Sequence, residues 1–296
     1  MNLKIPSPLT KINSHFLKNK GVELYIKRDD LIHEIISGNK WRKLKYNFLR
    51  VKKRKIKNIV SFGGKYSNHL HALSYLSKRF KIQSIGIVRG EREKNLNHTL
   101  SFCTENDMKL IFIDRSSYRT NKYDKNFLEK IKTNLGDFYL LPEGGNNKLG
   151  VKGCKEIISE IDIDFDFFCS SVGTGCTASG IIEKLPHNKK FIGFSPFKKN
   201  HEQISVIQNH CTNKKKNWYI FTDTEFGGFG KFNKELLNFI NDFYLEHKIK
   251  LDHIYNGKQL FYLFILIKKN FFPKKTRIIA LHTGGIQGVE SLNNFI

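Results

Sequence analysis

The stretch "FDFFCSSVGTG", residues 165 to 175, is an apolar run that ends in a glycine-rich loop. This order is typical of a buried β-strand followed by a loop at its carboxyl end. Three more stretches repeat it: "NIVSFGG" at 58–64, "FYLLPEGG" at 138–145 and "IIALHTGG" at 278–285. The repetition predicts sheets made of buried strands that share one kind of loop.

Segments of helical length lie between these runs, at residues 67–79, 94–106, 124–134, 149–160, 233–247 and 256–269. Alternating strands and helices predict an α/β protein with open, mostly parallel sheets flanked by helices. In such sheets, ligands bind beyond the carboxyl ends of the strands. The glycine loops are therefore candidates for parts of one shared site.

Length and composition predict a compact chain of one or two domains, since 296 residues contain 40% apolar residues and six prolines. The longest apolar run, "LFYLFILI" at 260–267, is far shorter than the roughly 18 residues of a membrane span. The start, "MNLKIPSPLT", has no signal-peptide core. We therefore expect a cytoplasmic protein with no membrane partner.

The cysteines and histidines do not predict a metal site. The five cysteines are odd in number, widely spaced and free of C-x-x-C pairs, which argues against a disulfide framework or a zinc knot. His69 and His71 could chelate a metal in principle, but no H-E-x-x-H motif or carboxylate cluster accompanies them.

The net charge of +24, from 51 Lys and Arg against 27 Asp and Glu, could indicate nucleic-acid binding. However, the basic residues are spread along the whole chain, and runs such as "KKRKIK" at 52–57 are short. A solvated surface is the favoured interpretation, so no specific nucleic-acid partner is expected. A basic nucleic-acid-binding protein stays a distant alternative, because it leaves the glycine loops unexplained.

The loop "SVGTGCTASG", residues 171–180, predicts a phosphate cradle. Glycines let the backbone approach an anion, and the amides at a helix N-terminus point at it. Gly173-x-Gly175-x-x-Ala178 also satisfies a loose dinucleotide pattern, so an NAD oxidoreductase is an alternative. That fingerprint needs an acidic residue about 20 residues further on, at the end of the next strand, and "FIGFSPFKK" at 191–199 has none.

Lys40 directly follows Gly38 and Asn39 in "SGNKWRKLKYN", residues 37–47. A lysine amine and a phosphate cradle are together what pyridoxal 5'-phosphate (PLP) requires. The chain resembles the fold-type II PLP enzymes, specifically the D-cysteine desulfhydrase and 1-aminocyclopropane-1-carboxylate (ACC) deaminase family. The matching stretches follow the family's order: "IKRDDL" 26–31, "SGNKWRKLKYN" 37–47, "SFGGKYSNHL" 61–70, "LPEGGNNKLGVKG" 141–153, "SSVGTGCTASG" 170–180, "LDHIYNGK" 251–258 and "LHTGG" 281–285.

The resemblance implies a two-domain, tryptophan synthase β-like fold with the cofactor in the interdomain cleft. Residues 1–42 and 150–296 would form the large PLP-binding domain, and residues 43–149 the smaller inserted one. A homodimer is also implied.

The resemblance makes Lys40 the Schiff-base lysine, and Lys43, one helical turn later, assists at the phosphate. The other residues implied at the phosphate are Gly173, Thr174, Gly175, Cys176 and Thr177. Burial beside a cation lowers the pKa of an amine, which would free Lys40 to attack an aldehyde and to carry the Cα proton.

The remaining residues would bind the ring and the substrate. Ser67 would face the substrate and Asn68 the phenolic oxygen of the cofactor and the substrate, although Ser67 also suits a helix cap. Tyr255 would take part in binding and catalysis. Asn256 would face the pyridine nitrogen, with Thr283 close by.

Three positions bear on the substrate. Where this chain has Asn256, ACC deaminases have Glu and desulfhydrases a small hydroxyl residue, so Asn256 departs from both but is nearer the neutral type. ACC deaminases have Leu where this chain has Thr283, which favours a desulfhydrase. Phe229 stands in a substrate-binding loop where the family usually has a tyrosine.

The implied reaction is PLP-dependent β-elimination from a small D-amino acid: D-cysteine would give pyruvate, sulfide and ammonia. In that reaction Lys40, Ser67 and Tyr255 would be the catalytic residues. The alternatives are an ACC deaminase, which opens the ring to 2-oxobutyrate and ammonia, or another fold-type II PLP lyase.

Overall fold

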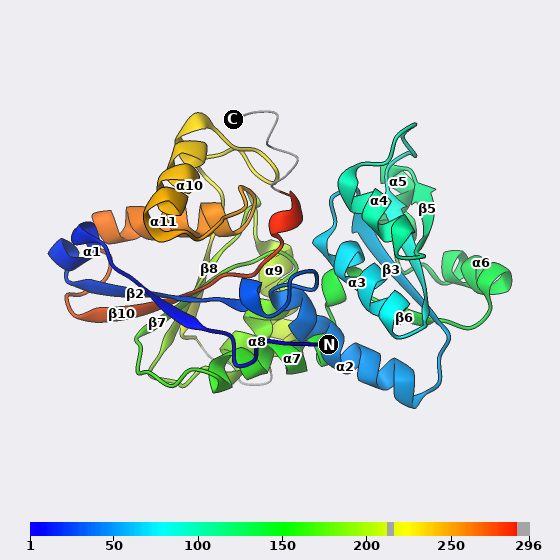
Figure 1. Cartoon of the computed structure of the whole chain (residues 1–296), viewed down its shortest axis with the longest axis horizontal. Helices are drawn as coiled ribbons and strands as arrows, with labels where there is room; N and C mark the ends of the chain where they lie inside the picture. The colour runs from blue at the N-terminus through cyan, green and yellow to red at the C-terminus, as the bar shows by residue number, and fades with distance from the viewer. Residues whose placement is uncertain (212–215, 289–296) are drawn as a thin grey trace.

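The computed structural model describes residues 1–211 and 216–288, and these residues build two separate β-sheets with helices around each (Figure 1). The larger sheet has six strands in the order β1-β2-β10-β7-β8-β9. The smaller has four, in the order β5-β4-β3-β6. All pairings are parallel except the edge pair β1 and β2. The predicted α/β class with mostly parallel sheets is confirmed.

The larger sheet is buried on both faces. Its strands are β1 (Leu9–Ile12), β2 (Val22–Lys27), β7 (Phe167–Ser171), β8 (Lys190–Phe194), β9 (Trp218–Phe221) and β10 (Thr276–Leu281). Alternate residues of β10 enter opposite cores: Ile278 and Ala280 one, Ile279 and Leu281 the other. The first core is closed by α1 (His15–Lys20), α10 (Lys234–His247) and α11 (Asn256–Lys268), and the second by α7 (Lys148–Ser159), α8 (Cys176–Lys184) and α9 (His201–His210).

The smaller sheet has the same layering. Its strands are β3 (Asn58–Gly64), β4 (Gln83–Arg89), β5 (Lys109–Ile113) and β6 (Tyr139–Leu141). One face packs on α2 (Asn39–Lys53), α3 (Asn68–Arg79) and α4 (His98–Glu105), and the other on α5 (Arg115–Asn121) and α6 (Lys125–Leu135). Short 3₁₀ helices, η1 (Asp29–Leu31), η2 (Glu143–Gly145) and η3 (Ile286–Gly288), lie in the loops.

Helix α2 connects the two halves of the molecule. Leu44, Phe48 and Val51 belong to the core of the smaller sheet, while α2 also packs along α7. The proposed boundary between residues 42 and 43 falls inside this continuous helix. The division into domains at 42/43 and 149/150 stays a prediction.

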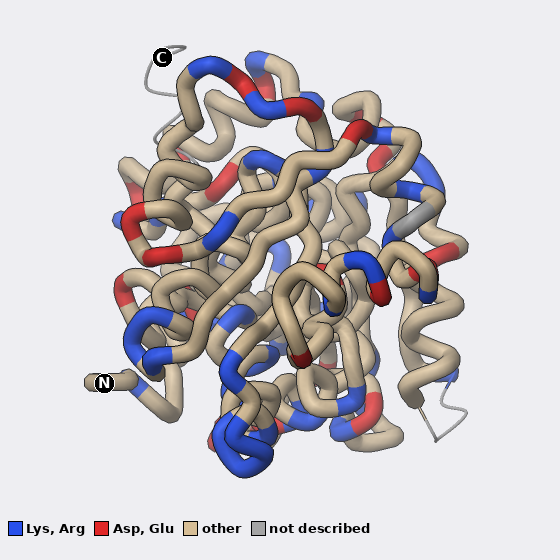
Figure 2. The backbone as a smooth tube through the Cα atoms, turned by 90° about the vertical axis from the view of Figure 1, so that its right-hand side faces the viewer, with Lys and Arg blue, Asp and Glu red and all other residues tan. Residues whose placement is uncertain are grey.

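The predicted helices all correspond to observed ones, α3, α4, α6, α7, α10 and α11, within a few residues at each end. The quoted glycines lie at the carboxyl ends of parallel strands: Gly63 and Gly64 are the last residues of β3, and the other three loops follow β6, β7 and β10. Figure 2 shows basic segments scattered over one face, with acidic segments among them. Within the described residues no helix is long and apolar enough to cross a membrane, and no group of three or more His, Cys, Asp or Glu could hold a metal.

Candidate active site

The glycine loop after β10 meets the start of α2 and the start of α3. Gly38 packs so closely on the loop after β10 that a Cβ there would lie 1.9 Å from the Thr283 carbonyl oxygen. The backbone N–H of Asn39 donates to that same oxygen at 3.2 Å. A Cβ on Gly285 would lie 2.3 Å from Asn68 Nδ2, at the start of α3. The predicted site segments around residues 38, 68 and 283 therefore converge.

Lys40 lies half-buried in the first turn of α2. Its Nζ donates to Asn39 Oδ1 at 2.6 Å, and Asn39 Nδ2 donates in turn to Thr177 Oγ1 at 3.2 Å. Burial first, and then the charge of Lys43, lower the pKa of Lys40 to about 7. A large share of this amine is therefore neutral near pH 7, the form that attacks an aldehyde.

Lys43 is a buried cation, only 5% exposed. The ion pairs between described residues include neither Lys40 nor Lys43. The aliphatic part of the Lys43 side chain lies against Gly145, where an added Cβ would be 3.1 Å from Lys43 Cβ. Burying a charge is costly unless a counter-charge accompanies it, so the surroundings of Lys43 suit an anion.

The loop before α8 provides the rest of an anion site. Gly175 has φ 86°, and α8 begins at Cys176, so its first amides face the loop. Thr174 Oγ1 is buried and has no hydrogen-bond partner within the described chain. Thr174 also packs on Gly144, where a Cβ would lie 2.8 Å from Thr174 Cγ2. An unpartnered hydroxyl, a helix N-terminus and a buried ammonium fit a phosphate group.

Cys176 is fully buried in the same loop, and its Sγ donates to the Gly145 carbonyl oxygen at 3.5 Å. A hydrogen bond with Cys154 and the charges of Lys43 and Lys40 lower the pKa of Cys176. The charges of both lysines therefore act on the first residue of α8, which favours an anion beside it.

Ser67 and Asn68 stand at the start of α3. Ser67 is the N-cap residue, because its Oγ accepts from the Leu70 N–H at 3.2 Å, and a Cβ on Gly63 would lie 2.6 Å from the same oxygen. Asn68 Oδ1 accepts a hydrogen bond from Gln287 Nε2. The cap role of Ser67 is confirmed, and the roles of both residues toward cofactor and substrate stay predictions.

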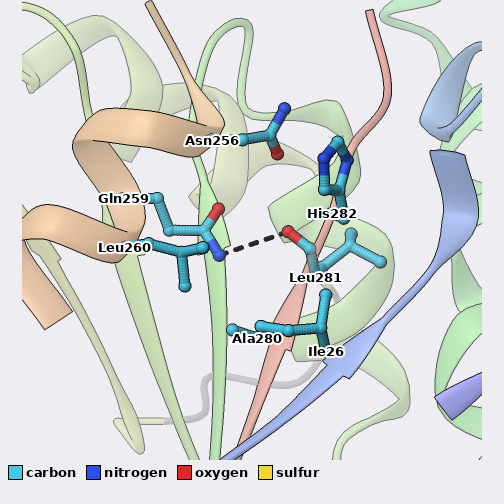
Figure 3. A pocket seen from close by; sticks show the side chains of 7 residues that line it. All are labelled: Ile26, Asn256, Gln259, Leu260, Ala280, Leu281 and His282. Atoms are coloured by element: carbon cyan, nitrogen blue, oxygen red, sulfur yellow. Dashed lines mark hydrogen bonds between the residues drawn. The ribbon is translucent and has the colours of Figure 1, made fainter. Parts of the chain in front are cut away.

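The amide of Asn256 is fully engaged. Its Oδ1 accepts from the Thr283 N–H at 2.9 Å and from Thr283 Oγ1 at 3.1 Å, while Nδ2 donates to Asp252 and, at 3.1 Å, to the Gly284 carbonyl oxygen. Figure 3 shows Asn256 and Gln259 on α11 facing the end of β10, where Gln259 Nε2 donates to the Leu281 carbonyl oxygen at 3.2 Å. Asn256 thus holds the loop after β10 to α11, a role that sequence reasoning missed. Its contact with a pyridine nitrogen stays a prediction.

Tyr255 connects the glycine loop before α8 with Phe229. A Cβ on Gly173 would lie 3.3 Å from Tyr255 Cε1, and burial raises the pKa of the Tyr255 phenol. The ring of Phe229, 45% exposed, stacks on Phe197 with centroids 5.1 Å apart and meets Tyr255 edge-on at 6.0 Å. The structure therefore brings all the predicted site residues into two contiguous groups, one around α2 and α8 and one around Tyr255. Gly173, in the loop before α8, packs on Tyr255 and so joins the two groups.

Sequence reasoning missed a buried ion network behind Lys43. Arg42 is fully buried and donates to both Asp29, at 2.9 and 3.1 Å, and Glu160. Lys27 adds a bond to Glu160 at 2.9 Å. The signal that could have found it is "IKRDDL", which places Lys27 and Asp29 in one short motif next to the lysine helix.

Comparisons with known proteins bear on the family and the fold of the chain. A family model described as "Pyridoxal-phosphate dependent enzyme" matches residues 2–284. A putative 1-aminocyclopropane-1-carboxylate deaminase of Pyrococcus horikoshii is 26% identical, over 90% of this chain and 86% of that protein. A mitochondrial bifunctional D-cysteine desulfhydrase/1-aminocyclopropane-1-carboxylate deaminase of Arabidopsis thaliana is also 26% identical, over 96% and 77%. The crystal structure of an ACC deaminase homologue superposes with a TM-score of 0.86 at 23% identity, covering 99% of this chain and 94% of the other, and supports the fold.

Proposed function

Because the chain belongs to the pyridoxal-phosphate dependent enzymes, we propose that it catalyses β-elimination from a small D-amino acid, with D-cysteine giving pyruvate, sulfide and ammonia. Membership of this family makes PLP its cofactor. The identity of the substrate, D-cysteine, is the more specific part of the proposal.

The observation that carries the choice of substrate is the neutral group at position 256. Asn256 is hydrogen-bonded to Thr283, and neither side chain has a carboxylate that could face the pyridine ring of the cofactor. A carboxylate would keep a pyridine nitrogen protonated and strengthen the ring as an electron sink. Eliminating a thiolate after loss of an ordinary Cα proton needs less of that sink than opening a cyclopropane ring, which has no Cα proton to lose.

Each candidate site residue would have its own role in this reaction. Lys43, Thr174 and the first amides of α8 would hold the phosphate. The neutral form of Lys40 would bond to the aldehyde and, once displaced by substrate, take the proton from Cα. Ser67 and Tyr255 would bind the substrate and relay protons. When bound, PLP supplies the electron sink for the charge left at Cα.

ACC deaminase is the second candidate function. The names of the Pyrococcus horikoshii and Arabidopsis thaliana relatives support it directly. Asn256 and Thr283 are the residues of this chain that count against it.

A substrate panel tests the proposal. Purified protein should absorb near ~420 nm, and borohydride reduction should attach the cofactor to Lys40. Lys40→Ala should lose both the absorbance and the attachment. It should then release sulfide and pyruvate from D-cysteine at least ~10-fold faster than 2-oxobutyrate from ACC, a difference of about 1.4 kcal/mol in the barrier. The L-enantiomer and D-serine serve as comparisons. Equal rates on ACC and D-cysteine would contradict the choice of substrate but not the cofactor.

A further inference from the structure

The carboxylate of Asp223 organises the loop at residues 223–230, "DTEFGGFG". Its oxygens accept hydrogen bonds from the Phe226 N–H at 2.9 Å and from the Gly228 N–H at 3.0 Å. The Lys258 ammonium donates to the same carboxylate at 2.6 Å and to the Gly228 carbonyl oxygen at 2.8 Å. Both backbone polar groups of Gly228 are therefore bonded, one to each member of this ion pair.

Tyr262 adds a second set of bonds to the loop. Its hydroxyl donates to the Asp223 carboxylate at 2.9 Å and accepts from the N–H groups of Thr224 and Glu225, both at 2.9 Å. Tyr262 and Lys258 both belong to α11 and lie one helical turn apart. Two side chains of one helix therefore hold the loop.

The ion pair between Asp223 and Lys258 is buried, with the two residues only 3% and 2% exposed. Burial alone would raise the pKa of Asp223, but the bonds from Lys258 and from the Phe226 N–H outweigh it and lower that pKa, so the carboxylate stays charged. Desolvation offsets most of the attraction within such a pair, which therefore adds little net stability. Its bonds nevertheless hold the groups that they join in one arrangement.

Phe229 is the residue of this loop that meets the candidate site, and it directly follows Gly228. Its ring stacks on Phe197 and meets Tyr255 edge-on. The Phe197 carbonyl oxygen accepts from the Asp223 N–H at 2.9 Å, so Asp223 also holds the backbone of the stacking partner. Since Phe229 is still 45% exposed, part of its ring is free to contact a bound molecule.

We propose that Asp223 and Lys258 are positioning residues that set substrate preference: their ion pair holds the Phe229 ring against Tyr255 as an apolar wall of the substrate site. Lys258 lies in the first turn of α11, which begins directly after Tyr255, so one helix end positions both sides of this contact. A phenyl ring offers no partner to a hydroxyl, whereas a thiol behaves as a small apolar group. The wall therefore favours a thiol at Cβ over a hydroxyl. The inference rests on the proposed function in one respect, that the substrate binds beside Tyr255.

Hydrogen exchange followed by mass spectrometry tests the positioning without cofactor or substrate. Lys258→Met keeps an apolar side chain but loses both bonds, so the amides of residues 224–228 should exchange at least ~10-fold faster than in the wild type. Tyr262→Phe keeps the ring, should give a smaller increase, and tests the same loop if Lys258→Met folds poorly. Lys268→Met is the matched control, because Lys268 is exposed in the last turn of the same helix and its loss should not change the exchange.

Substrate preference tests the role of the wall. The ratio of kcat/KM for D-cysteine to kcat/KM for D-serine includes a difference between leaving groups, but that difference is the same in every variant. Lys258→Met should lower this ratio by roughly 10-fold, within the ~10²-fold by which an apolar pocket rejects an added hydroxyl. Phe229→Ala should lower it as much, and the double variant should lower it no further, because both substitutions remove the same wall. Lys268→Met should keep the wild-type ratio.

Two results would overturn the proposal. One is wild-type exchange of the 224–228 amides in Lys258→Met, and the other is an effect of Lys258→Met on the ratio that persists undiminished in the Phe229→Ala background. If wild-type protein turns over neither D-amino acid, the proposed function fails, and the exchange experiment still decides whether the ion pair positions the loop.

Discussion

At the scale of single residues, the chemistry of Lys40 depends on its neighbours. Its amine is half-buried, close to a second cation and oriented by Asn39. Burial and the charge of Lys43 both disfavour the ammonium form, which is why its pKa falls to about 7. The reactivity of Lys40 should therefore change with pH and with the charge at position 43.

We expect the rate at which cofactor-free protein bonds PLP to rise with pH through about 7 and to level off above it, because only the neutral amine attacks. Lys43→Met removes a positive charge, raises the pKa of Lys40 and should move the midpoint to higher pH. Lys43→Arg keeps the charge and should leave the midpoint near that of the wild type. Stopped-flow absorbance near ~420 nm measures the rate. An unchanged midpoint in Lys43→Met would show that Lys43 does not control this amine.

At the scale of elements, α2 is fixed to its surroundings by Arg42. The buried guanidinium bonds Asp29 in η1, which is also buried, and Glu160 just after α7, which is partly buried. Burial disfavours the charge on Glu160, but the bonds from Arg42 and Lys27 outweigh it and lower the pKa of Glu160 to about 2. The network keeps the helix that carries both site lysines in place.

Arg42→Met should lower the free energy of unfolding by roughly 3–5 kcal/mol, because it leaves the buried carboxylate of Asp29 and the partly buried carboxylate of Glu160 without their main partner. Lys45 provides the control, since it lies on the same helix and pairs with Glu156 on α7 at 2.8 Å, but both side chains are partly exposed. Lys45→Ala should cost at most about 1 kcal/mol. Urea unfolding followed by circular dichroism compares the two. Similar losses in both variants would mean that burial of the Arg42 network adds nothing.

The sequence predicts local elements better than their arrangement. β3 and β10 were foreseen because buried apolar runs end in paired glycines, and α3 because Ser67 caps a helix. The order β1-β2-β10 could not be foreseen, since it pairs the first strands with the last, and such contacts depend on the packing of the whole chain. The same holds for the candidate site. Motifs in the sequence predict Lys40 and Thr283 as site residues. The bond between Asn256 and Thr283 required the folded structure.

At the scale of the whole molecule, the net charge of +24 is distributed over many elements (Figure 2). Scattered lysines attract polyanions by releasing counterions, but they do not recognise a base sequence.

We therefore expect any binding of DNA or RNA to be weak and independent of sequence, and to fall steeply between ~50 and ~200 mM salt. Fluorescence anisotropy with two unrelated oligonucleotides measures this, and PLP-loaded protein should behave like cofactor-free protein. Tight, sequence-selective binding at physiological salt would instead support a nucleic-acid function.

The placement of Lys40 and Lys43 in one helical turn has a consequence for choosing between vitamers. The helix separates their Cα atoms by a rise of about 4.5 Å, and packing on α7 and the smaller sheet keeps that rise fixed. If Lys40 bonds the aldehyde and Lys43 faces the phosphate, as proposed, the first turn of α2 fixes the spacing between the points where the two side chains are attached. Free pyridoxal would then meet only Lys40, whereas the phosphorylated vitamer would meet both lysines. We therefore expect the protein to bind the phosphorylated vitamer more tightly than free pyridoxal.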